Sequence, residues 1–370
     1  MKIAMVHDYL NQYGGAEKTI EVLSELFPDA PIFTSIFDKD KLPPIFRQMN
    51  IKVSFMQKFP FLDKHFKKYL LFYPKAIESF DLSGYDLVLS SSSAFAKGAI
   101  KDKNACHVCY CYTPMRFVWD YDNYVEKEDF GKLNRKILPL AIKKLKKWDI
   151  ANIDRVDYYI AISNYIKDRI KRCYNREAEV IYPPVNVKNF SIVNKTEDYF
   201  LIVSRLNAYK NIDLVIDAFN DLGLNLKIVG SGPYRKTLEC MVQNKNIEFL
   251  GRLDDKDLKE IYSKCKAYIF PGREDFGITP VEAQASGRPV IAYADGGALE
   301  TILDGITGLF FKENSKSAFI ETVKRFLKIE DTLDRNKIRE NALRFGTDIF
   351  KKRIIDFINY KYSDCKNKAV

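Results

Sequence analysis

Short apolar runs alternate with amphipathic segments of helix length along most of the chain. The amphipathic segments include 211–221, 254–265 and 316–328. Uninterrupted apolar strands separated by helices are typical of parallel sheets that helices cover on both faces. We therefore expect an α/β protein with doubly wound sheets. The runs expected to form strands are 3–9, 30–37, 86–92, 107–113, 158–163, 199–205, 224–230, 247–250, 267–271 and 289–293.

A double proline, Pro183-Pro184, interrupts this alternation, which starts again beyond Val185. Proline lacks a backbone donor and disfavours helix in the residue before it. The segment 180–185 is therefore expected to link two doubly wound domains.

The composition is that of an ordinary globular protein, with 370 residues, 46% of them hydrophobic and 29% charged. No uncharged apolar run approaches the roughly 20 residues that cross a bilayer. The first residues reach a charge too early for the apolar region of a signal peptide. We therefore expect a cytosolic protein.

The seven cysteines are scattered and odd in number, which argues against a disulfide framework. Cys106, Cys109 and Cys111 lie beside His107 in an apolar strand, where Cys109 and Cys111 share one face and Cys106 the other. No second cluster of ligands accompanies them in the sequence. We expect these cysteines to act as small hydrophobic residues rather than as metal ligands.

The net charge of +10 is concentrated in residues 1–190, which carry +7 of it. Residues 132–147 hold seven basic and no acidic side chains beside an apolar stripe, and Trp148 follows. The stretch 55–73 mixes lysines with aromatic residues. Basic charge with apolar bulk suits an anionic membrane surface, whereas two solvated helices packed on their own domain would show the same pattern. The sequence leaves both interpretations open, and it contains no recognised nucleic-acid motif.

The most specific candidate site follows the run 267–271. Gly277 precedes a helix whose first turn accepts Pro280, so the backbone N–H groups near Gly277, Ile278 and Thr279 would form a cradle for a diphosphate. Glu282 lies one turn inside that helix and would reach hydroxyl groups beside the phosphates. Glu274 precedes the glycine and would face the other end of the ligand.

Two basic residues follow the run 199–205. Arg205 and Lys210 come at a strand end rather than along a helix face, and together they would neutralise a diphosphate leaving group. The Gly14-Gly15 pair before the first helix is a weaker signal, because two glycines there are more often simply a turn.

These segments resemble the retaining GT-B glycosyltransferases of the sucrose-synthase-like, mannosyltransferase-containing class, glycosyltransferase family 4. The similar motifs occur in family order over nearly the whole chain: Gly-Gly-Ala-Glu 14–17, Ser-Arg-Leu…Lys-Asn 204–211, Gly-Ser-Gly-Pro 230–233, Glu274-x7-Glu282, Ala-Ser-Gly-Arg-Pro-Val 285–290, Gly-Gly-Ala-Leu-Glu 296–300 and Asp-Gly-Ile-Thr-Gly-Leu 304–309. The resemblance implies a GT-B fold of two Rossmann-like domains facing across a cleft. It implies an acceptor-binding domain over 1–182, a nucleotide-sugar-binding domain over 183–346, and a final helix, about 347–362 within 347–370, that packs back onto the first domain.

The resemblance also implies a role for each site residue. Arg205 and Lys210 would bind the donor diphosphate and Glu274 the transferred sugar, and these three would be the catalytic residues. Glu282 would bind the nucleotide ribose. The remaining binding residues would be Gly15, Phe276, Gly277, Ile278 and Thr279, of which Gly15 would approach the phosphate from the N-terminal domain. The resemblance implies neither a metal nor a cofactor.

The segment 111–120 resembles bacterial O-antigen and capsule mannosyltransferases more narrowly. Where those relatives usually carry a histidine, this chain has Tyr112. The resemblance predicts a hexosyltransferase that moves mannose from GDP-mannose to a lipid-linked saccharide, working as a cytoplasmic, peripheral enzyme at the inner face of the plasma membrane. UDP-N-acetylhexosamine or a deoxysugar nucleotide as donor, and an epimerase or phosphorylase activity, are the alternatives. The presence of Arg205, Lys210, Glu274 and Glu282 argues against a non-catalytic relative.

Overall fold

The chain divides into two compact units, one formed by Met1–Pro184 with Phe350–Val370 and the other by Val185–Ile349. We describe each unit separately, from a computed structural model. The structure describes all residues except 121–130 and 370, and it leaves out the side chains of 63–64, 131–137 and 368–369.

Unit 1 contains a parallel sheet whose strand order is β3-β2-β1-β4-β5-β6-β7. The strands are β1 (Ile3–His7), β2 (Ile32–Thr34), β3 (Ile51–Val53), β4 (Leu87–Ser92), β5 (Cys106–Cys111), β6 (Tyr158–Ala161) and β7 (Ala178–Val180). The helices are α1 (Gly15–Leu26), α2 (Leu62–His65), α3 (Tyr73–Glu78), α4 (Arg116–Trp119), α6 (Gly131–Ala151), α7 (Asn164–Tyr174) and α15 (Thr347–Ala369), the last of which begins in unit 2. Short 3₁₀ turns include η2 (Phe55–Lys58), η3 (Phe66–Phe72) and η4 (Ala96–Gly98).

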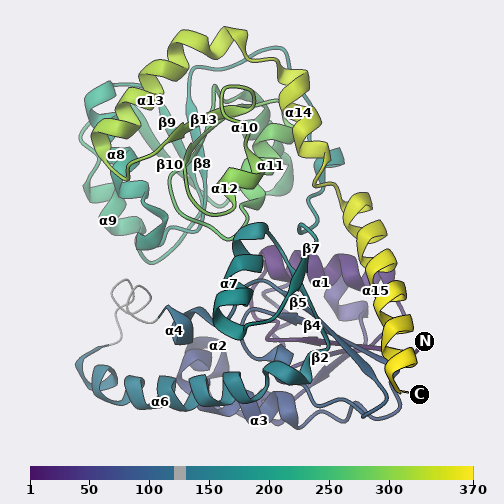
Figure 1. The fold of residues 1–370 in the computed structure, drawn as a ribbon. Coiled ribbons are helices and arrows are strands. Elements are labelled where there is room, and N and C mark those ends of the chain that lie inside the picture. The colour runs from purple at the N-terminus through teal and green to yellow at the C-terminus, as the bar shows by residue number, and fades with distance from the viewer. Residues whose placement is uncertain (121–130, 370) are drawn as a thin grey trace. The chain divides into compact units, whose positions relative to one another are not determined.

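Helices cover both faces of the unit 1 sheet (Figure 1). On one face, Val6 and Val88 share a buried cluster with Ile77 of α3 and Leu145 of α6. On the other face, the ring of Tyr110 contacts Phe350 of α15 at 5.7 Å between centroids. The sheet is therefore buried on both sides, as its uninterrupted apolar strands predict.

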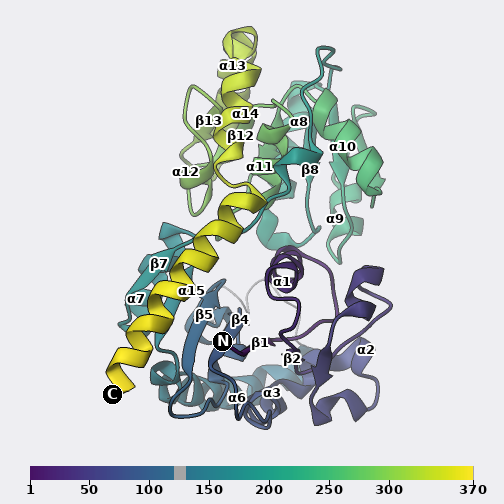
Figure 2. The ribbon, with the colours of Figure 1, turned by 90° about the vertical axis from the view of Figure 1, so that its right-hand side faces the viewer.

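Unit 2 repeats the same arrangement with the strand order β10-β9-β8-β11-β12-β13, again all parallel. Its strands are β8 (Phe200–Val203), β9 (Leu226–Val229), β10 (Ile247–Gly251), β11 (Tyr268–Phe270), β12 (Val290–Tyr293) and β13 (Gly308–Phe311). Its helices are α8 (Ile212–Leu222), α9 (Arg235–Cys240), α10 (Asp255–Lys264), α11 (Ile278–Ala285), α12 (Ala298–Thr301), α13 (Lys316–Ile329) and α14 (Arg335–Leu343). Figures 1 and 2 show α8 and α13 on one side of this sheet and α10 and α11 on the other.

Every run expected to form a strand overlaps one, which confirms the fold class. The strands β3, β7 and β13 were not among the expected runs. β3 and β7 have three residues each and mixed burial. They lie at the two edges of the unit 1 sheet, where pairing with one neighbour stabilises a segment that has no apolar pattern of its own.

Candidate active site

The order of strands in unit 2 indicates where a ligand would bind. From β8 the chain continues to β9, towards one edge of the unit 2 sheet. From β11 it continues to β12, towards the other edge. Ligands of such sheets bind beyond the carboxyl ends of the strands where the order reverses. The segments that follow β8 and β11, which carry the predicted donor residues, lie at that point.

These two segments approach each other at backbone level. A Cβ atom on Gly272 would lie 3.1 Å from the carbonyl oxygen of Lys210. Asn211 has a positive φ of 54°, and its side-chain amide donates to the carbonyl of Pro271. The glycine at 272 therefore allows the loop after β11 to reach the turn that carries Lys210.

Lys210 forms an ion pair with Glu274 in this crevice. Their side chains are 16% and 22% exposed, so neither is fully solvated. The two residues also line a small cavity with Ser204 and Gly272. Sequence reasoning assigned Lys210 and Glu274 to different parts of a ligand and did not foresee this contact. Arg205 follows β8 and is exposed.

The helix α11 begins directly after this loop, at Ile278. Its N-cap, Gly277, has a φ of 91°, and a Cβ atom there would meet the ring of Phe270 at 2.9 Å. Because glycine carries no side chain to cap the helix, the first backbone N–H groups of α11 keep their capacity for an anion. A larger residue at 277 would clash with Phe270 and strain the backbone, so the loop and this cradle would both be displaced.

Two buried tyrosines fix the first turns of α11. The hydroxyl of Tyr262 donates to Glu282 at 3.0 Å, and Glu282 is only 6% exposed. The hydroxyl of Tyr268 bonds Thr279 at 2.8 Å and the carbonyl of Val203 in β8 at 2.9 Å. Burial raises the pKa of both phenols, so they stay protonated and act as donors. Sequence reasoning missed these supports, because a tyrosine on the buried side of a helix or in an apolar strand looks like any core residue.

The Gly296-Gly297 pair packs directly against the loop that carries Glu274. A Cβ atom on Gly296 would lie 2.3 Å from the carbonyl oxygen of Glu274, and one on Gly297 would lie 2.3 Å from the Cα of Phe276. The N–H of Gly297 also donates to the carbonyl of Glu274 at 2.9 Å. The side chain of Phe276 is buried against Phe345, which leaves its backbone at the site.

The predicted Gly15 loop lies beyond β1 in unit 1. Gly15 begins α1, and the N–H of Gly14 donates to the Glu17 carboxylate at 2.8 Å. Tyr112 is nearly buried, and its hydroxyl donates to the carbonyl of Ala16 at 3.1 Å and bonds Ser91 at 2.9 Å. Tyr112 therefore supports the first turn of α1 through the hydrogen bond of its hydroxyl group to Ala16.

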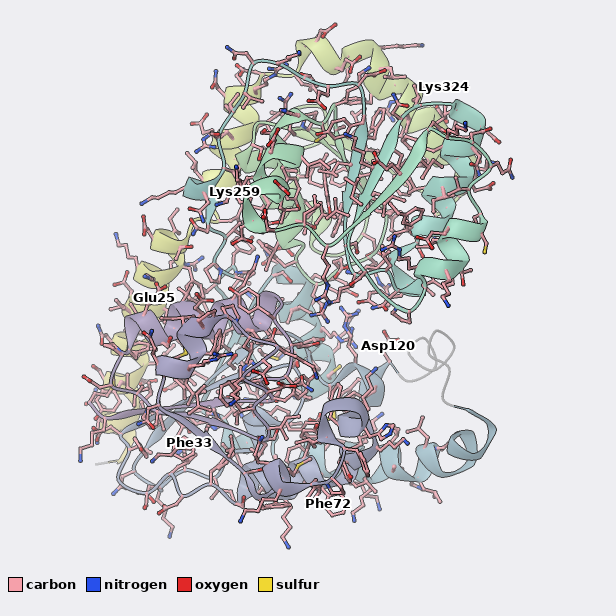
Figure 3. The ribbon with its side chains drawn as sticks, turned by 180° about the vertical axis from the view of Figure 1, so that it is seen from behind. Glu25, Phe33, Phe72, Asp120, Lys259 and Lys324 are labelled. Carbon is pink, nitrogen blue, oxygen red and sulfur yellow. A yellow bond between two sulfur atoms is a disulfide. The ribbon has the colours of Figure 1, made fainter. Side chains whose placement is uncertain are left out.

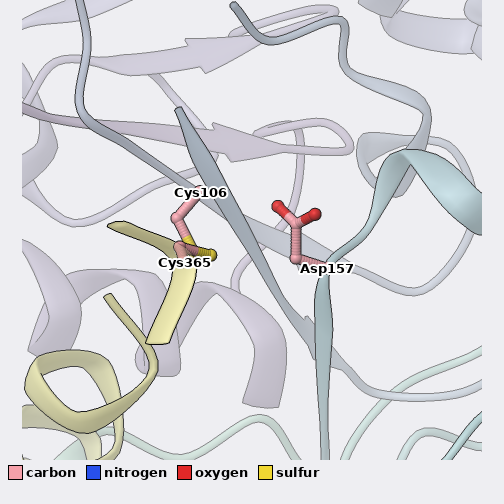
Figure 4. A group of neighbouring side chains, drawn as sticks. All are labelled: Cys106, Asp157 and Cys365. Atoms are coloured by element: carbon pink, nitrogen blue, oxygen red, sulfur yellow. A yellow bond between two sulfur atoms is a disulfide. The ribbon is translucent and has the colours of Figure 1, made fainter. Parts of the chain in front are cut away.

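The expectation that Cys106 acts as a small hydrophobic residue is wrong. Cys106 and Cys365 form a disulfide that joins β5 to α15, with Asp157 beside it (Figure 4). Residues 259 apart in sequence pair here, which spacing alone does not reveal. The ligand atoms of Cys106, Cys365 and Asp157 lie within 4.8 Å of one another, but bonded sulfurs are not the thiolates that ligate metals.

The basic stretch 132–147 lies within α6, and the side chains of 132–137 are outside the described residues. Ile142 and Leu145 are buried in the unit 1 core, and Trp148 donates to Glu78 at 2.9 Å. Trp148 therefore packs against the unit 1 core, as the interpretation of a helix packed on its own domain expects. Lys143, Lys144, Lys146 and Lys147 are exposed, and Leu140 is 72% exposed.

The stretch 55–73 forms η2, α2 and η3 and ends at Tyr73, the first residue of α3. The side chain of Lys64 is outside the described residues. Phe61 is 72% exposed, and Phe55, Leu71 and Phe72 are also exposed. Figures 1 and 2 show α2, α3 and α6 at the same end of unit 1, and Figure 3 shows Phe72 at its edge. Among the described helices, none has both the length and the apolarity required to cross a bilayer.

Comparison with known proteins identifies the class of this arrangement. A solved structure of sucrose-phosphate synthase from Thermosynechococcus elongatus matches 98% of this chain and 100% of its own, with a TM-score of 0.77 and 17% identity. That likeness establishes the fold, which is the GT-B fold of two Rossmann-like domains. Residues 13–189 match the model of Glycosyltransferase Family 4, and residues 186–345 match the model of Glycosyl transferases group 1. The chain belongs to the family of glycosyltransferases that these two models describe, which together cover residues 13–345.

The curated relatives are glycosyltransferases too. An uncharacterized glycosyltransferase of Methanocaldococcus jannaschii is 32% identical over 54% of this chain and 56% of its own length. The O-antigen chain mannosyltransferase RfbU of Salmonella typhimurium is 29% identical over 63% of this chain and 64% of its own length. The chain thus spans between about half and two thirds of the length of these relatives.

Proposed function

We propose that this chain is a retaining hexosyltransferase that moves mannose from GDP-mannose to a lipid-linked saccharide. The observation that supports it most is the pairing of Lys210 with Glu274 beside the uncapped start of α11, at the switch point of unit 2. A cation and a helix N-terminus suit a diphosphate, and a carboxylate suits the hydroxyl groups of a sugar. The name of the Salmonella relative supports mannose.

In this proposal each residue keeps the role that the resemblance implies. Arg205 and Lys210 bind the diphosphate with the backbone of 276–278, Glu274 binds the sugar and Glu282 the ribose. Thr279 and Gly15 complete the donor contacts. Binding of the donor would exchange the ion pair of Lys210 and Glu274 for two contacts with the ligand.

The chemistry needs no base from the protein. The acceptor hydroxyl attacks the anomeric carbon while the bond from that carbon to the diphosphate oxygen breaks. The attack comes from the face that the diphosphate leaves, so the configuration is retained. The proton passes from the hydroxyl to the departing phosphate oxygen, and Arg205 and Lys210 stabilise the charge that develops there.

A donor screen tests this function. Purified protein is given a lipid-linked saccharide and, in turn, GDP-mannose, UDP-N-acetylhexosamines and deoxysugar nucleotides, and free nucleotide diphosphate and glycosylated product are measured. We expect GDP release with mannosylated product. Tight binding of UDP and none of GDP in calorimetry would contradict the donor, and epimer or sugar phosphate as the product would favour the alternative activities.

We also propose that unit 1 attaches reversibly to anionic membranes through the exposed lysines of α6. Each basic residue near such a surface contributes about 1 kcal/mol, so a few lysines are enough, and Leu140 and Phe61 add exposed apolar surface. The protein should sediment with anionic liposomes and not with neutral ones, and high salt should release it.

A pair of charge variants tests the membrane proposal. Replacing Lys143, Lys144, Lys146 and Lys147 with Gln should reduce liposome binding. The control replaces four exposed basic residues of unit 2, Lys312, Lys324, Arg325 and Lys328, and removes the same charge (Lys324 is labelled in Figure 3). If both variants bound alike, the lysines of α6 would be ordinary solvated residues.

A further inference from the structure

Two residues of unit 2 that have different proposed roles, Lys210 and Glu274, contact each other. Lys210 is proposed to bind the diphosphate of the donor and Glu274 its sugar, yet in the structure the ammonium of Lys210 pairs with the carboxylate of Glu274. The oxygen in this contact, Oε1 of Glu274, is buried. Each end of the donor would therefore find its protein partner engaged by the partner of the other end.

Backbone contacts hold the two loops that carry this ion pair. The side-chain amide of Asn211, next to Lys210, donates to the carbonyl of Pro271 at 3.4 Å. On the other loop, the carbonyl of Glu274 accepts from the N–H of Gly297 at 2.9 Å. Separation of the ion pair therefore falls to the side chains, and a diphosphate must compete with Glu274 for Lys210.

The donor and its product differ in what they offer Glu274. A nucleoside diphosphate supplies an anion for Lys210 but no sugar hydroxyl for Glu274, so the carboxylate loses one partner and gains none. A poorly solvated charge without a partner is costly. A nucleotide sugar avoids this cost, because hydroxyl groups of its sugar donate to the carboxylate.

We propose that Glu274 discriminates the nucleotide sugar from its nucleoside diphosphate product, by competing with the diphosphate for Lys210. The inference rests on the proposed transferase function. After transfer, the carboxylate has lost the hydroxyl groups of the sugar and pairs with the ammonium again. The ion pair thereby weakens binding of the product and speeds its release.

Calorimetry with GDP, and with UDP in parallel, tests this competition. Glu274→Gln removes the charge and keeps the size of the side chain. It should bind the nucleoside diphosphate about three- to fivefold more tightly than wild type, which is the effect expected of a partly exposed ion pair. The release rate of a fluorescent GDP analogue should fall by a similar factor. A residue that only contacted the sugar would leave both quantities unchanged.

Two further variants make the test independent of one substitution. Glu274→Ala also removes the charge and should show the same gain in affinity, and thermal unfolding verifies that each variant is folded. Lys210→Ala should itself weaken the binding of GDP. Adding Glu274→Gln to it should change the affinity little, because the carboxylate no longer has an ammonium to withhold from the diphosphate.

Glu330→Gln is the matched control. Glu330 pairs with Lys266 at 3.7 Å, and their side chains are 27% and 23% exposed, close to the 22% and 16% of Glu274 and Lys210. Lys266 precedes β11, whereas Glu274 follows it, so this ion pair belongs to the other end of the strand. Loss of its charge should leave the affinity for GDP at the wild-type value.

Two results would overturn the inference. One is nucleoside diphosphate affinity in Glu274→Gln and Glu274→Ala no higher than in wild type, as expected if the ammonium contacted both anions at once. The other is an equal gain from Glu274→Gln with and without Lys210, which would indicate repulsion alone. The proposed function fails separately, if the gain appears but no nucleotide sugar is turned over. Binding of neither GDP nor UDP would remove both.

Discussion

At the scale of single residues, the proposed donor site depends on charges that are only partly solvated. Lys210 and Glu274 contact each other at low exposure, where a charge without a partner is costly. A ligand that separates them must offer each a partner of equal quality. A diphosphate beside a sugar hydroxyl meets that condition, whereas a neutral ligand would leave the ammonium without an anion.

Lys210→Ala tests the role of this charge. The variant should lower kcat/KM for the donor by an amount equivalent to about 2–4 kcal/mol, because the departing diphosphate loses a cation. Steady-state kinetics with varied donor concentration measure the loss. Lys266→Ala is the control, since Lys266 pairs with Asp198 and Glu330 away from the crevice, and turnover of Lys210→Ala at the wild-type rate would remove the assignment.

His107 predicts a loss of stability in acid. Burial lowers its pKa to about 4, and its ring bonds the carbonyl of Arg155 and the hydroxyl of Ser90. Below the usual histidine pKa of about 6.5, the His107 ring is protonated in the unfolded chain. In the folded protein the ring stays neutral until the pH approaches 4. The unfolding free energy should therefore fall as the pH drops from about 6.5 to 4, by up to about 3 kcal/mol from this residue.

Denaturant titrations across that pH range measure the effect. His107→Gln should show a smaller slope of unfolding free energy against pH than wild type, whatever its stability at neutral pH. His65→Gln changes an exposed histidine and should keep the wild-type slope. Equal slopes in all three proteins would show that His107 does not titrate as proposed.

At the scale of elements, the loop between β11 and α11 depends on the Gly296-Gly297 turn. Both Gly296 and Gly305 have positive φ, at 63° and 74°. A side chain at Gly305 would meet no atom within 4 Å, whereas one at Gly296 would meet the carbonyl of Glu274. The two glycines therefore separate backbone strain from steric overlap.

Gly305→Ala should cost about 1–2 kcal/mol of stability, from the left-handed backbone alone. Gly296→Ala should cost a further 1–3 kcal/mol or so from overpacking, and it alone should weaken nucleotide binding, because it moves the loop that carries Glu274. Thermal unfolding and calorimetry with nucleotide diphosphate give the two quantities. Equal nucleotide affinity in both variants would show that this turn does not affect nucleotide binding.

At the scale of the whole molecule, the disulfide between Cys106 and Cys365 ties the last helix to the start of β5 in the unit 1 sheet. It closes a loop that includes all of unit 2. A cross-link of this kind restricts the unfolded chain and typically contributes about 2–4 kcal/mol. Further contacts of α15 with unit 1 include the ion pair of Lys351 with Glu25 and the hydrogen bond between Tyr158 and Asp364.

Reduction should therefore lower the free energy of unfolding by about 2–4 kcal/mol, and Cys365→Ser should reproduce the loss and be insensitive to reductant. Cys240→Ser, at an exposed cysteine outside the disulfide, is the control and should behave as wild type. Peptide mapping under non-reducing conditions identifies the linked pair. Absence of a peptide joining 106 to 365 would contradict the disulfide.

The sequence by itself determined ten of the thirteen strands that the structure describes, and it predicted the segments of the site. Apolar runs of a few residues between amphipathic helices have one stable outcome, a sheet covered on both faces, and that pattern is local. Glycine and charge at the ends of such runs, as at Gly277 and Arg205, are local as well. They predicted where a ligand would be bound before any contact was known.

The tertiary structure decided which of these residues touch. Lys210 and Glu274 lie 64 positions apart, and no local pattern records that two loops come into contact when β8 and β11 pair. The same reason hid the disulfide of Cys106 and the inward direction of Trp148. Each depends on which surfaces of distant segments meet, and packing, not the pattern along the chain, determines that.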